Sequence, residues 1–329
     1  MASARSAFTA LATVALIGLL VATGTRASLA LLTGSTTVSA NAFTTAASFD
    51  TVAPTVSATV IAKSGLYVAG SIKQGGTYYV YANATDGGAA PSGIATIRAD
   101  VSAVTAGQTA VSLVAGTYTT GGVTYGYRTS AQTANASLTT GSKSYALTST
   151  DNNANSRLQT GFTVTVDNAA PKATDIQAVN GGATVGRIEL GDRITYTFSE
   201  AVDPESILAG WTGASTNVVV RFTNNASLDT FAIWNAANTV QLPMGSVNTN
   251  GNFVGGAVTA GASGTASTIV LNTSTKTITV TLGTVAGTLT TDATNRTSKW
   301  TPSASAFDTA SNAMSTTAVY EAGPTDPDF

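Results

Sequence analysis

Carboxylates are the most versatile chemical groups in this chain, because its 329 residues include no His and no Cys. That absence excludes a Ser-His-Asp triad, a thiol nucleophile, disulfides and any metal site built on imidazole or thiolate ligands. What remains is oxygen chemistry: binding of hard cations by carboxylate and amide oxygens, or acid–base catalysis by paired carboxyl groups. The sequence offers candidates for both.

Five Asp and Asn residues have the types and positions expected of a calcium site. Three are carboxylates in loops or at a strand end, and two are amides beside one of them: Asp86, Asp151, Asp167, Asn153 and Asn155. Ca²⁺ takes about six to eight oxygen ligands. These five residues are therefore candidate Ca²⁺ ligands, and Asp167 is the best placed, since an ion there would stiffen the joint between modules. In the alternative interpretation these residues only form turns by bonding to their own backbone, and no cofactor is required.

A second acidic group in the later half has other interpretations. Glu200, Asp203 and Glu205 are close in sequence, and Asp308 belongs to a late turn. Two carboxylates about 5–10 Å apart would suit a glycosidase; otherwise the group is a solvated acidic turn. A carbohydrate-binding module is a further alternative, with the three Trp rings stacked on sugars, although such rings usually pack in cores. We expect no catalytic residues and no enzyme activity.

The charge content limits the partners of the chain. Lys and Arg number 15 against 17 Asp and Glu, so we expect no nucleic-acid binding. Charged residues are only 10% of the chain, well below the roughly 25% of typical soluble proteins. Thr, Ser and Asn must therefore provide the polar exterior. Such a surface suits self-association, or binding of neighbouring surface proteins and glycans, with sheet edges available for strand addition.

The first 30 residues have the order of a secretory signal peptide. Arg5 is followed by the apolar run 10–22 and then by small residues, with cleavage expected after Ala27 or Ala30. The run is shorter than the ~20 residues of a comfortable membrane span. Membrane contact is therefore expected only if the segment stays uncleaved as an anchor. The predicted location is secreted or at the cell surface.

The rest of the chain is dominated by short β-branched and aromatic runs between Gly- and Asn-rich turns. Runs such as 193–198 and 277–282 alternate with period two, which puts one face of a strand on a core and the other in water. Two similar Asp-x-x-x-Pro segments, 50–54 and 167–171, mark where modules begin, because Pro cannot extend a strand ladder. This pattern predicts β-sandwiches.

The residues after the apolar run resemble the start of SipW-dependent exported proteins, the group of TasA-like fibre proteins and camelysins. The match covers about residues 1–50, and its best segment is Asn41-Ala42-Phe43-Thr44. Leu32-Thr33-Gly34 stands where that group usually has Phe-Thr-Asp. The resemblance implies an exported bacterial protein with a role in an extracellular matrix.

Longer segments resemble the immunoglobulin-like repeats of bacterial S-layer and adhesin proteins. They are 145–155, 162–171, 191–203 and 306–314. Such repeats close on an Asp-x-x-Gly-Asn turn, in which Ala154 and Ser311 replace Gly here. The resemblance implies scaffold modules, whose fold alone does not define a function.

The predicted organisation is all-β, with two tandem immunoglobulin-like β-sandwich modules after the signal peptide. The predicted segments are a signal peptide (1–30), an N-terminal segment (31–53), a first module (54–170), a second module (171–320) with an insertion at about 223–268, and an acidic tail (321–329). We predict an exported bacterial cell-surface or extracellular-matrix protein with a non-enzymatic structural or adhesive role. A carbohydrate-binding module or a carboxylate-dependent glycosidase is the alternative.

Overall fold

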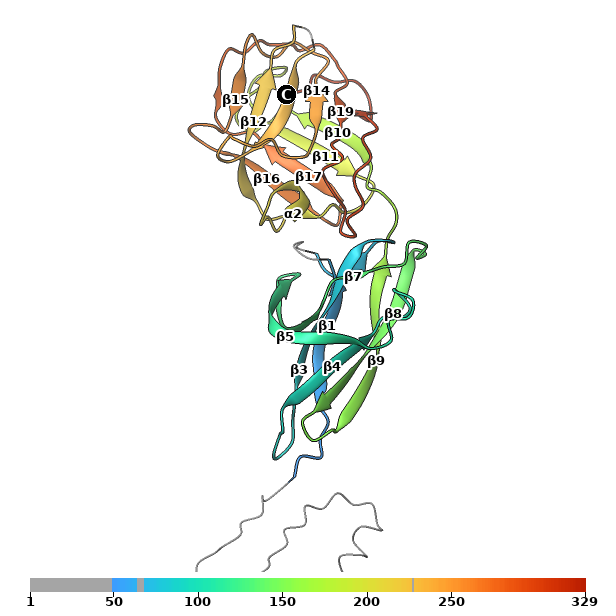
Figure 1. Ribbon diagram of the computed structural model, residues 1–329. Coiled ribbons are helices and arrows are strands. Elements are labelled where there is room, and N and C mark those ends of the chain that lie inside the picture. Colours follow the sequence, from blue (N-terminus) through green and yellow to red (C-terminus); the bar gives the residue numbers. More distant parts are fainter. Residues whose placement is uncertain (1–48, 64–67, 227) are drawn as a thin grey trace, which may run out of the picture. The chain divides into compact units, whose positions relative to one another are not determined.

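The computed structural model describes residues 49–63, 68–226 and 228–329 (Figure 1). These residues form strands β1–β20 and one short helix, α2. The predicted fold class, all-β with two tandem sandwich modules, is confirmed. The predicted signal peptide and residues 31–48 of the N-terminal segment lie outside the described residues. None of the helices in the described part of the chain has the length and apolar character needed to cross a membrane.

The first module is built from nine strands. They are β1 (Thr55–Ala62), β2 (Ser71–Ile72), β3 (Thr77–Thr85), β4 (Ile94–Asp100), β5 (Val111–Thr120), β6 (Val123–Thr129), β7 (Gln132–Thr133), β8 (Gly141–Asp151) and β9 (Ser156–Val166). Their order is β1-β3-β6-β5-β4-β8-β9-β2, with β7 against β3. All pairs are antiparallel except β2 with β9.

The alternation of buried and exposed residues along β8 places both core side chains and Asp151 on the inward face of the strand. Every second residue from Tyr145 to Asp151 is buried, and the residues between them are partly exposed. Tyr145 and Leu147 pack in the core with Val164. Asp151 is the last residue of that inward row. Period-two geometry therefore directs its carboxylate inward at the end of the strand.

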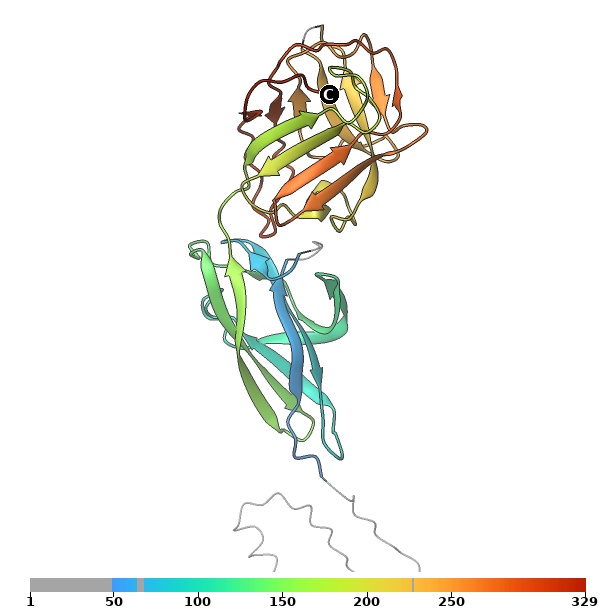
Figure 2. The same ribbon diagram turned by 180° about the vertical axis from the view of Figure 1, so that it is seen from behind.

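The second module contains the remaining strands and the helix. They are β10 (Ala173–Val179), β11 (Arg193–Phe198), α2 (Pro204–Ile207), β12 (Thr216–Thr223), β13 (Thr230–Asn235), β14 (Ser246–Asn248), β15 (Val258–Ala260), β16 (Ser267–Asn272), β17 (Thr277–Thr281), β18 (Val285–Ala286), β19 (Lys299–Thr301) and β20 (Val319–Tyr320). The order is β10-β11-β17-β16-β12-β13-β14-β19-β20, and β15 pairs with β12 and β18. Figure 2 shows β10, β11, β17 and β16 side by side.

The centre of the second core is Trp300. Its ring is fully buried and meets Tyr196 and Phe198 edge-on, with centroids 4.9 Å and 5.2 Å away. Trp211 is also buried, and the Arg221 guanidinium carbon lies 3.6 Å from the ring centroid of Trp234. The three Trp rings therefore do not form one exposed face for sugars.

Segment 223–268, predicted as an insertion of hairpins and loops, also contributes to the second core. It supplies β13, β14 and β15, and Phe231, Phe253 and Val258 belong to the second core. Two of these strands have only three residues, so their Asn- and Gly-rich surroundings conceal them in the sequence.

Segment 321–329 also differs from the predicted acidic tail. Glu321 and Asp328 are buried, and the ring of Phe329 lies in the second core against Phe253, with centroids 5.3 Å apart. The Arg296 N–H donates to the Asp326 carbonyl oxygen over 2.8 Å. Its Pro-rich acidic composition suggests disorder, but these tertiary contacts order the segment.

Candidate calcium sites at the start of each module

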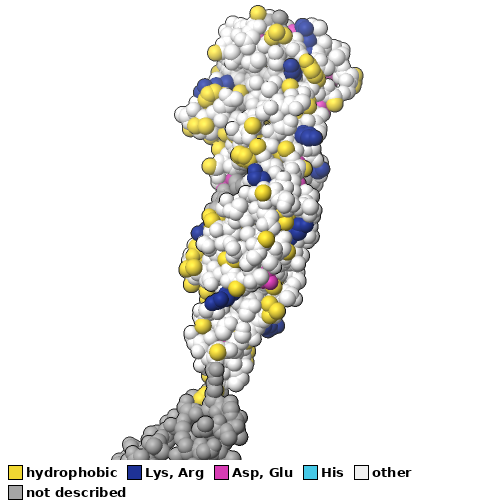
Figure 3. All heavy atoms as spheres, turned by 45° about the vertical axis from the view of Figure 1, so that its right-hand side comes forward, with side chains coloured by type: hydrophobic (Ala, Val, Ile, Leu, Met, Phe, Trp, Pro, Cys, Tyr) yellow, Lys and Arg dark blue, Asp and Glu magenta, His cyan; other side chains and the backbone are white. Residues whose placement is uncertain are grey.

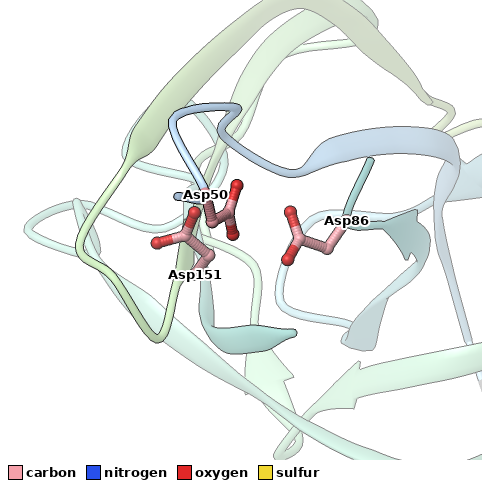
Figure 4. A group of neighbouring side chains, drawn as sticks. All are labelled: Asp50, Asp86 and Asp151. Carbon is pink, nitrogen blue, oxygen red and sulfur yellow. The ribbon is translucent and has the colours of Figure 1, made fainter. Parts of the chain in front are cut away.

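The first acidic cluster consists of Asp50, Asp86 and Asp151. Asp50 precedes β1, Asp86 follows β3, and Asp151 ends β8. One carboxylate oxygen from each lies within 4.8 Å of those of the other two. Figure 4 shows the Asp86 carboxylate turned toward that of Asp50, with Asp151 beside Asp50.

A tight turn fixes the Asp151 carboxylate. Its Oδ1 accepts the N–H groups of Asn153 and Asn155 over 2.9 Å and 2.8 Å, and its Oδ2 accepts Asn155 Nδ2 over 2.7 Å. The same Nδ2 donates to the Asp50 carbonyl oxygen over 3.1 Å. The Asn155 amide thus connects the segment before β1 to the turn between β8 and β9.

Hydrogen bonds satisfy Asp50 more fully than Asp86. Asp50 accepts the Ser92 N–H over 2.7 Å, and its hydrogen bonds with Ser92 hold its pKa below the usual value. Asp86 Oδ2 accepts the Gly93 N–H over 2.6 Å, whereas its Oδ1 is buried and has no hydrogen-bond partner. A buried oxygen without a partner is costly, and a cation would satisfy it.

The second acidic cluster consists of Asp167, Glu200 and Asp308, again with one oxygen from each within 4.8 Å of the others. Asp308 Oδ1 accepts the N–H groups of Ala310 and Asn312 over 2.8 Å and 2.7 Å, and Oδ2 accepts Asn312 Nδ2 over 2.7 Å. This Nδ2 also donates to the Asp167 carbonyl oxygen over 2.9 Å. The hydrogen bonds match those around Asp151.

The two clusters correspond position by position. In each, an Asn four residues after the late Asp bonds both that carboxylate and the entering segment. The residue before this Asn has a left-handed backbone, with φ 67° at Ala154 and φ 70° at Ser311. The entering Asp stands four residues before Pro54 or Pro171. The same arrangement of acidic residues and hydrogen bonds therefore occurs at the start of each module.

Electrostatics in the second cluster favour a cation or a proton. Burial, and then the charges of Asp167 and Asp308, raise the pKa of Glu200 to about 7. Burial also raises the pKa of Asp308, and Asp167 adds to the shift. Like charges at short range oppose ionisation, and a bound cation reverses that effect.

The predicted site residues divide between the two clusters. Asp86 and Asp151 lie in the first, and Asp167 lies in the second. Asn155 contacts the first cluster through its amide nitrogen, whereas Asn153 contributes only its backbone N–H and its side chain is exposed. Asp50 is not among the residues predicted from the sequence, although its spacing to Pro54 matches that of Asp167 to Pro171.

The other predicted acidic group also separates. Glu200 and Asp308 meet in the second cluster, but Asp203 caps α2 by accepting the Glu205 N–H over 3.0 Å. Asp203 is fully buried, and its Oδ2 lies 3.8 Å from Lys63 Nζ. Asp203 therefore has a structural role at the helix start.

Comparison with known proteins finds similarity only among solved structures. No family model matches the chain, and no curated protein matches it. Among solved structures, it is similar to the C-terminal domain of the antigen I/II-family protein AspA of Streptococcus pyogenes. The identity is 12%, the TM-score is 0.20, and the match covers 83% of this chain and 99% of that chain.

Proposed function

We propose that this chain is an exported bacterial cell-surface or extracellular-matrix protein with a structural or adhesive, non-enzymatic role. In this proposal Ca²⁺ binds at the start of each module and fixes the segment that enters it. The observation that carries the proposal is the repetition of one acidic cluster at corresponding positions of both modules. The expected signal peptide supports export.

The chemistry of the two clusters suits calcium. All six acidic side chains offer oxygen, the donor that hard cations prefer. The first site would use Asp50, Asp86 and Asp151, and the second would use Asp167, Glu200 and Asp308. Among the residues that the structure describes, no Lys or Arg nitrogen lies within 4.0 Å of these carboxylates. The ion would supply the missing positive charge.

The placement of each cluster suits a mechanical role. Each joins three segments that are distant in sequence: an entering linker, a loop and a late turn. Ordering a linker costs about 1–2 kcal/mol per residue in backbone entropy. A bound ion would offset that entropy cost in the linker that enters each module.

The surface suits contact with other macromolecules outside the cell. Figure 3 shows few charged side chains on the face in view, as expected from a chain with only 10% charged residues. Neighbouring surface proteins, glycans or further copies of the chain would be its partners, since a weakly charged surface is cheap to desolvate.

Calcium titration with matched variants tests the proposal. We expect Ca²⁺ to bind by calorimetry and to raise the melting temperature, and Asp151→Asn and Asp308→Asn should each remove one bound ion. Glu205→Gln, outside all acidic clusters, is the control. Light scattering should show Ca²⁺-dependent assembly. A monodisperse monomer at high concentration with Ca²⁺, together with unchanged ion binding in both variants, would contradict the proposal.

A further inference from the structure

A third acidic cluster lies at the end of the second module. It consists of Glu321, Asp326 and Asp328, which follow β20, and one oxygen from each lies within 4.8 Å of the others. It has no Asp-x-x-x-Asn turn and no entering linker, so it is not a copy of the first two clusters. Its residues come from the segment that the sequence presents as a tail.

Ser298, just before β19, bonds one oxygen of each buried acid and leaves the other free. Its N–H donates to Glu321 Oε2 over 3.1 Å, and its Oγ donates to Asp328 Oδ2 over 2.8 Å. The remaining oxygens, Glu321 Oε1 and Asp328 Oδ1, are buried without a hydrogen-bond partner. Glu321 is 7% exposed and Asp328 is fully buried. Two unpartnered oxygens in one buried cluster call for a bound positive charge.

Nearby basic groups do not supply that charge. Within the described ranges, no Lys or Arg nitrogen lies within 4.0 Å of the three carboxylates. Arg296 pairs instead with Asp292 over 3.1 Å and contacts Asp326 only through backbone groups. Burial, and then Asp328, raise the pKa of Glu321 to about 8, and burial raises the pKa of Asp328 to about 6. Both shifts are in the direction expected of two buried acids that each keep one oxygen without a partner.

We propose that Glu321, Asp326 and Asp328 form a third divalent-cation site, of the oxygen-ligand class that takes Ca²⁺. The site does not depend on calcium binding at the module starts. Two buried acids provide fixed oxygens, and the exposed Asp326 would add a third ligand from the solvent side.

Binding at this site would hold the end of the second module together. Phe329 follows Asp328 directly, and its ring contacts Phe222, Phe231 and Phe253 in the core. The Gly186 N–H donates to the Phe329 carbonyl oxygen over 2.6 Å. An ion bound to Asp328 would thus fix the backbone next to Phe329. Cation binding would therefore stabilise the packing of the Phe329 ring in the core.

The test is a calorimetric titration of the full chain with CaCl₂ at about pH 9, above the pKa of about 8 of Glu321, so that protons compete little for the site. We expect three bound ions in the parent chain and two in Glu321→Gln. Asp326→Asn alters an exposed side chain that leaves the fold intact, and we expect it to weaken the third ion about tenfold. Glu205→Gln should keep three ions.

The outcomes separate this site from the two at the module starts. Loss of one ion in Glu321→Gln supports the third site even if Asp151→Asn and Asp308→Asn lose none, which would count only against the proposed function. Unchanged ion number and affinity in both Glu321→Gln and Asp326→Asn would overturn it. In that case Glu321 and Asp328 would share a proton and bind no cation.

Discussion

At the scale of single residues, one amide performs two tasks in each module. Asn155 and Asn312 each donate through Nδ2 to a carboxylate of their own turn and to a backbone carbonyl of the entering segment. A carboxylate in the same position would offer no donor and would add a negative charge to an acidic cluster. The amide orients the acids without competing for the ion, so its removal should affect stability even without calcium.

Replacing Asn155 or Asn312 by Ala should therefore lower the free energy of unfolding by about 1–3 kcal/mol each, because two acceptors lose their donor. Urea unfolding in calcium-free buffer measures the loss. Asn153→Ala removes an exposed side chain from the same turn and should change stability by less than about 0.5 kcal/mol. An equal loss at Asn153 would show that the turn, and not the amide bridge, sets the effect.

The raised pKa values of Glu200 and Glu321 predict how stability depends on pH without divalent cations. Their pKa values are about 7 and about 8 in the folded state, against 4.5 for an ordinary Glu. Between these limits the folded chain holds protons that the unfolded chain has released, so stability falls as pH rises. The contribution is fully present below about pH 4.5 and is lost through about pH 8. Melting temperatures in EDTA between about pH 5 and pH 8 measure this.

A double variant identifies the groups responsible. Glu200→Gln with Glu321→Gln should flatten the profile, because the amides do not titrate, whereas Glu205→Gln should keep it. Saturating Ca²⁺ should also flatten the profile of the parent chain. Stability that rises across this range in EDTA would contradict the assignment.

At the scale of elements, the turns 151–155 and 308–312 each have a residue in a backbone conformation that favours Gly. Ala154 and Ser311 have φ 67° and φ 70°, in the left-handed region where a Cβ is unfavourable. Ala154→Gly and Ser311→Gly should each raise the free energy of unfolding by about 1 kcal/mol. Denaturant unfolding measures the gain. Asn153→Gly, at a position with negative φ, should not stabilise the chain, and a gain there would remove the conformational explanation.

The same scale shows what local sequence can and cannot predict. Alternation predicts β11 and β17, and the Asp-x-x-x-Asn turn draws attention to Asp151, because neighbours along the chain determine both. Segment 321–329 has no such pattern: its burial depends on Ser298, more than twenty residues earlier, and on the core around Phe329. Local sequence therefore does not predict the third acidic cluster. Asp50 could have been found from its spacing to Pro54.

At the scale of the described chain, the two modules have separate hydrophobic cores, and polar contacts connect them at the linker and beside it, where Lys63 and Lys73 donate to the Asp308 and Ser311 carbonyl oxygens. The first core ends at Val166 and the second begins at Ala173. Between them, Asn312 bonds the Asp167 carbonyl oxygen, and Lys172 exchanges hydrogen bonds with Ser199. Few apolar contacts order this linker, so an ion on Asp167 should have a large effect on its opening.

Calcium should therefore slow trypsin cleavage after Lys172, the exposed basic residue of this linker. Proteases act on locally opened chain, and binding to the closed form reduces its population. Mass spectrometry of fragments over time gives the cleavage rate at this bond. Asp308→Asn should abolish the protection, whereas Asp151→Asn, the matched change in the first cluster, should keep it. Equal protection in the Asp308→Asn variant would mean that calcium acts elsewhere in the chain, and the second cluster would then have no role at the joint.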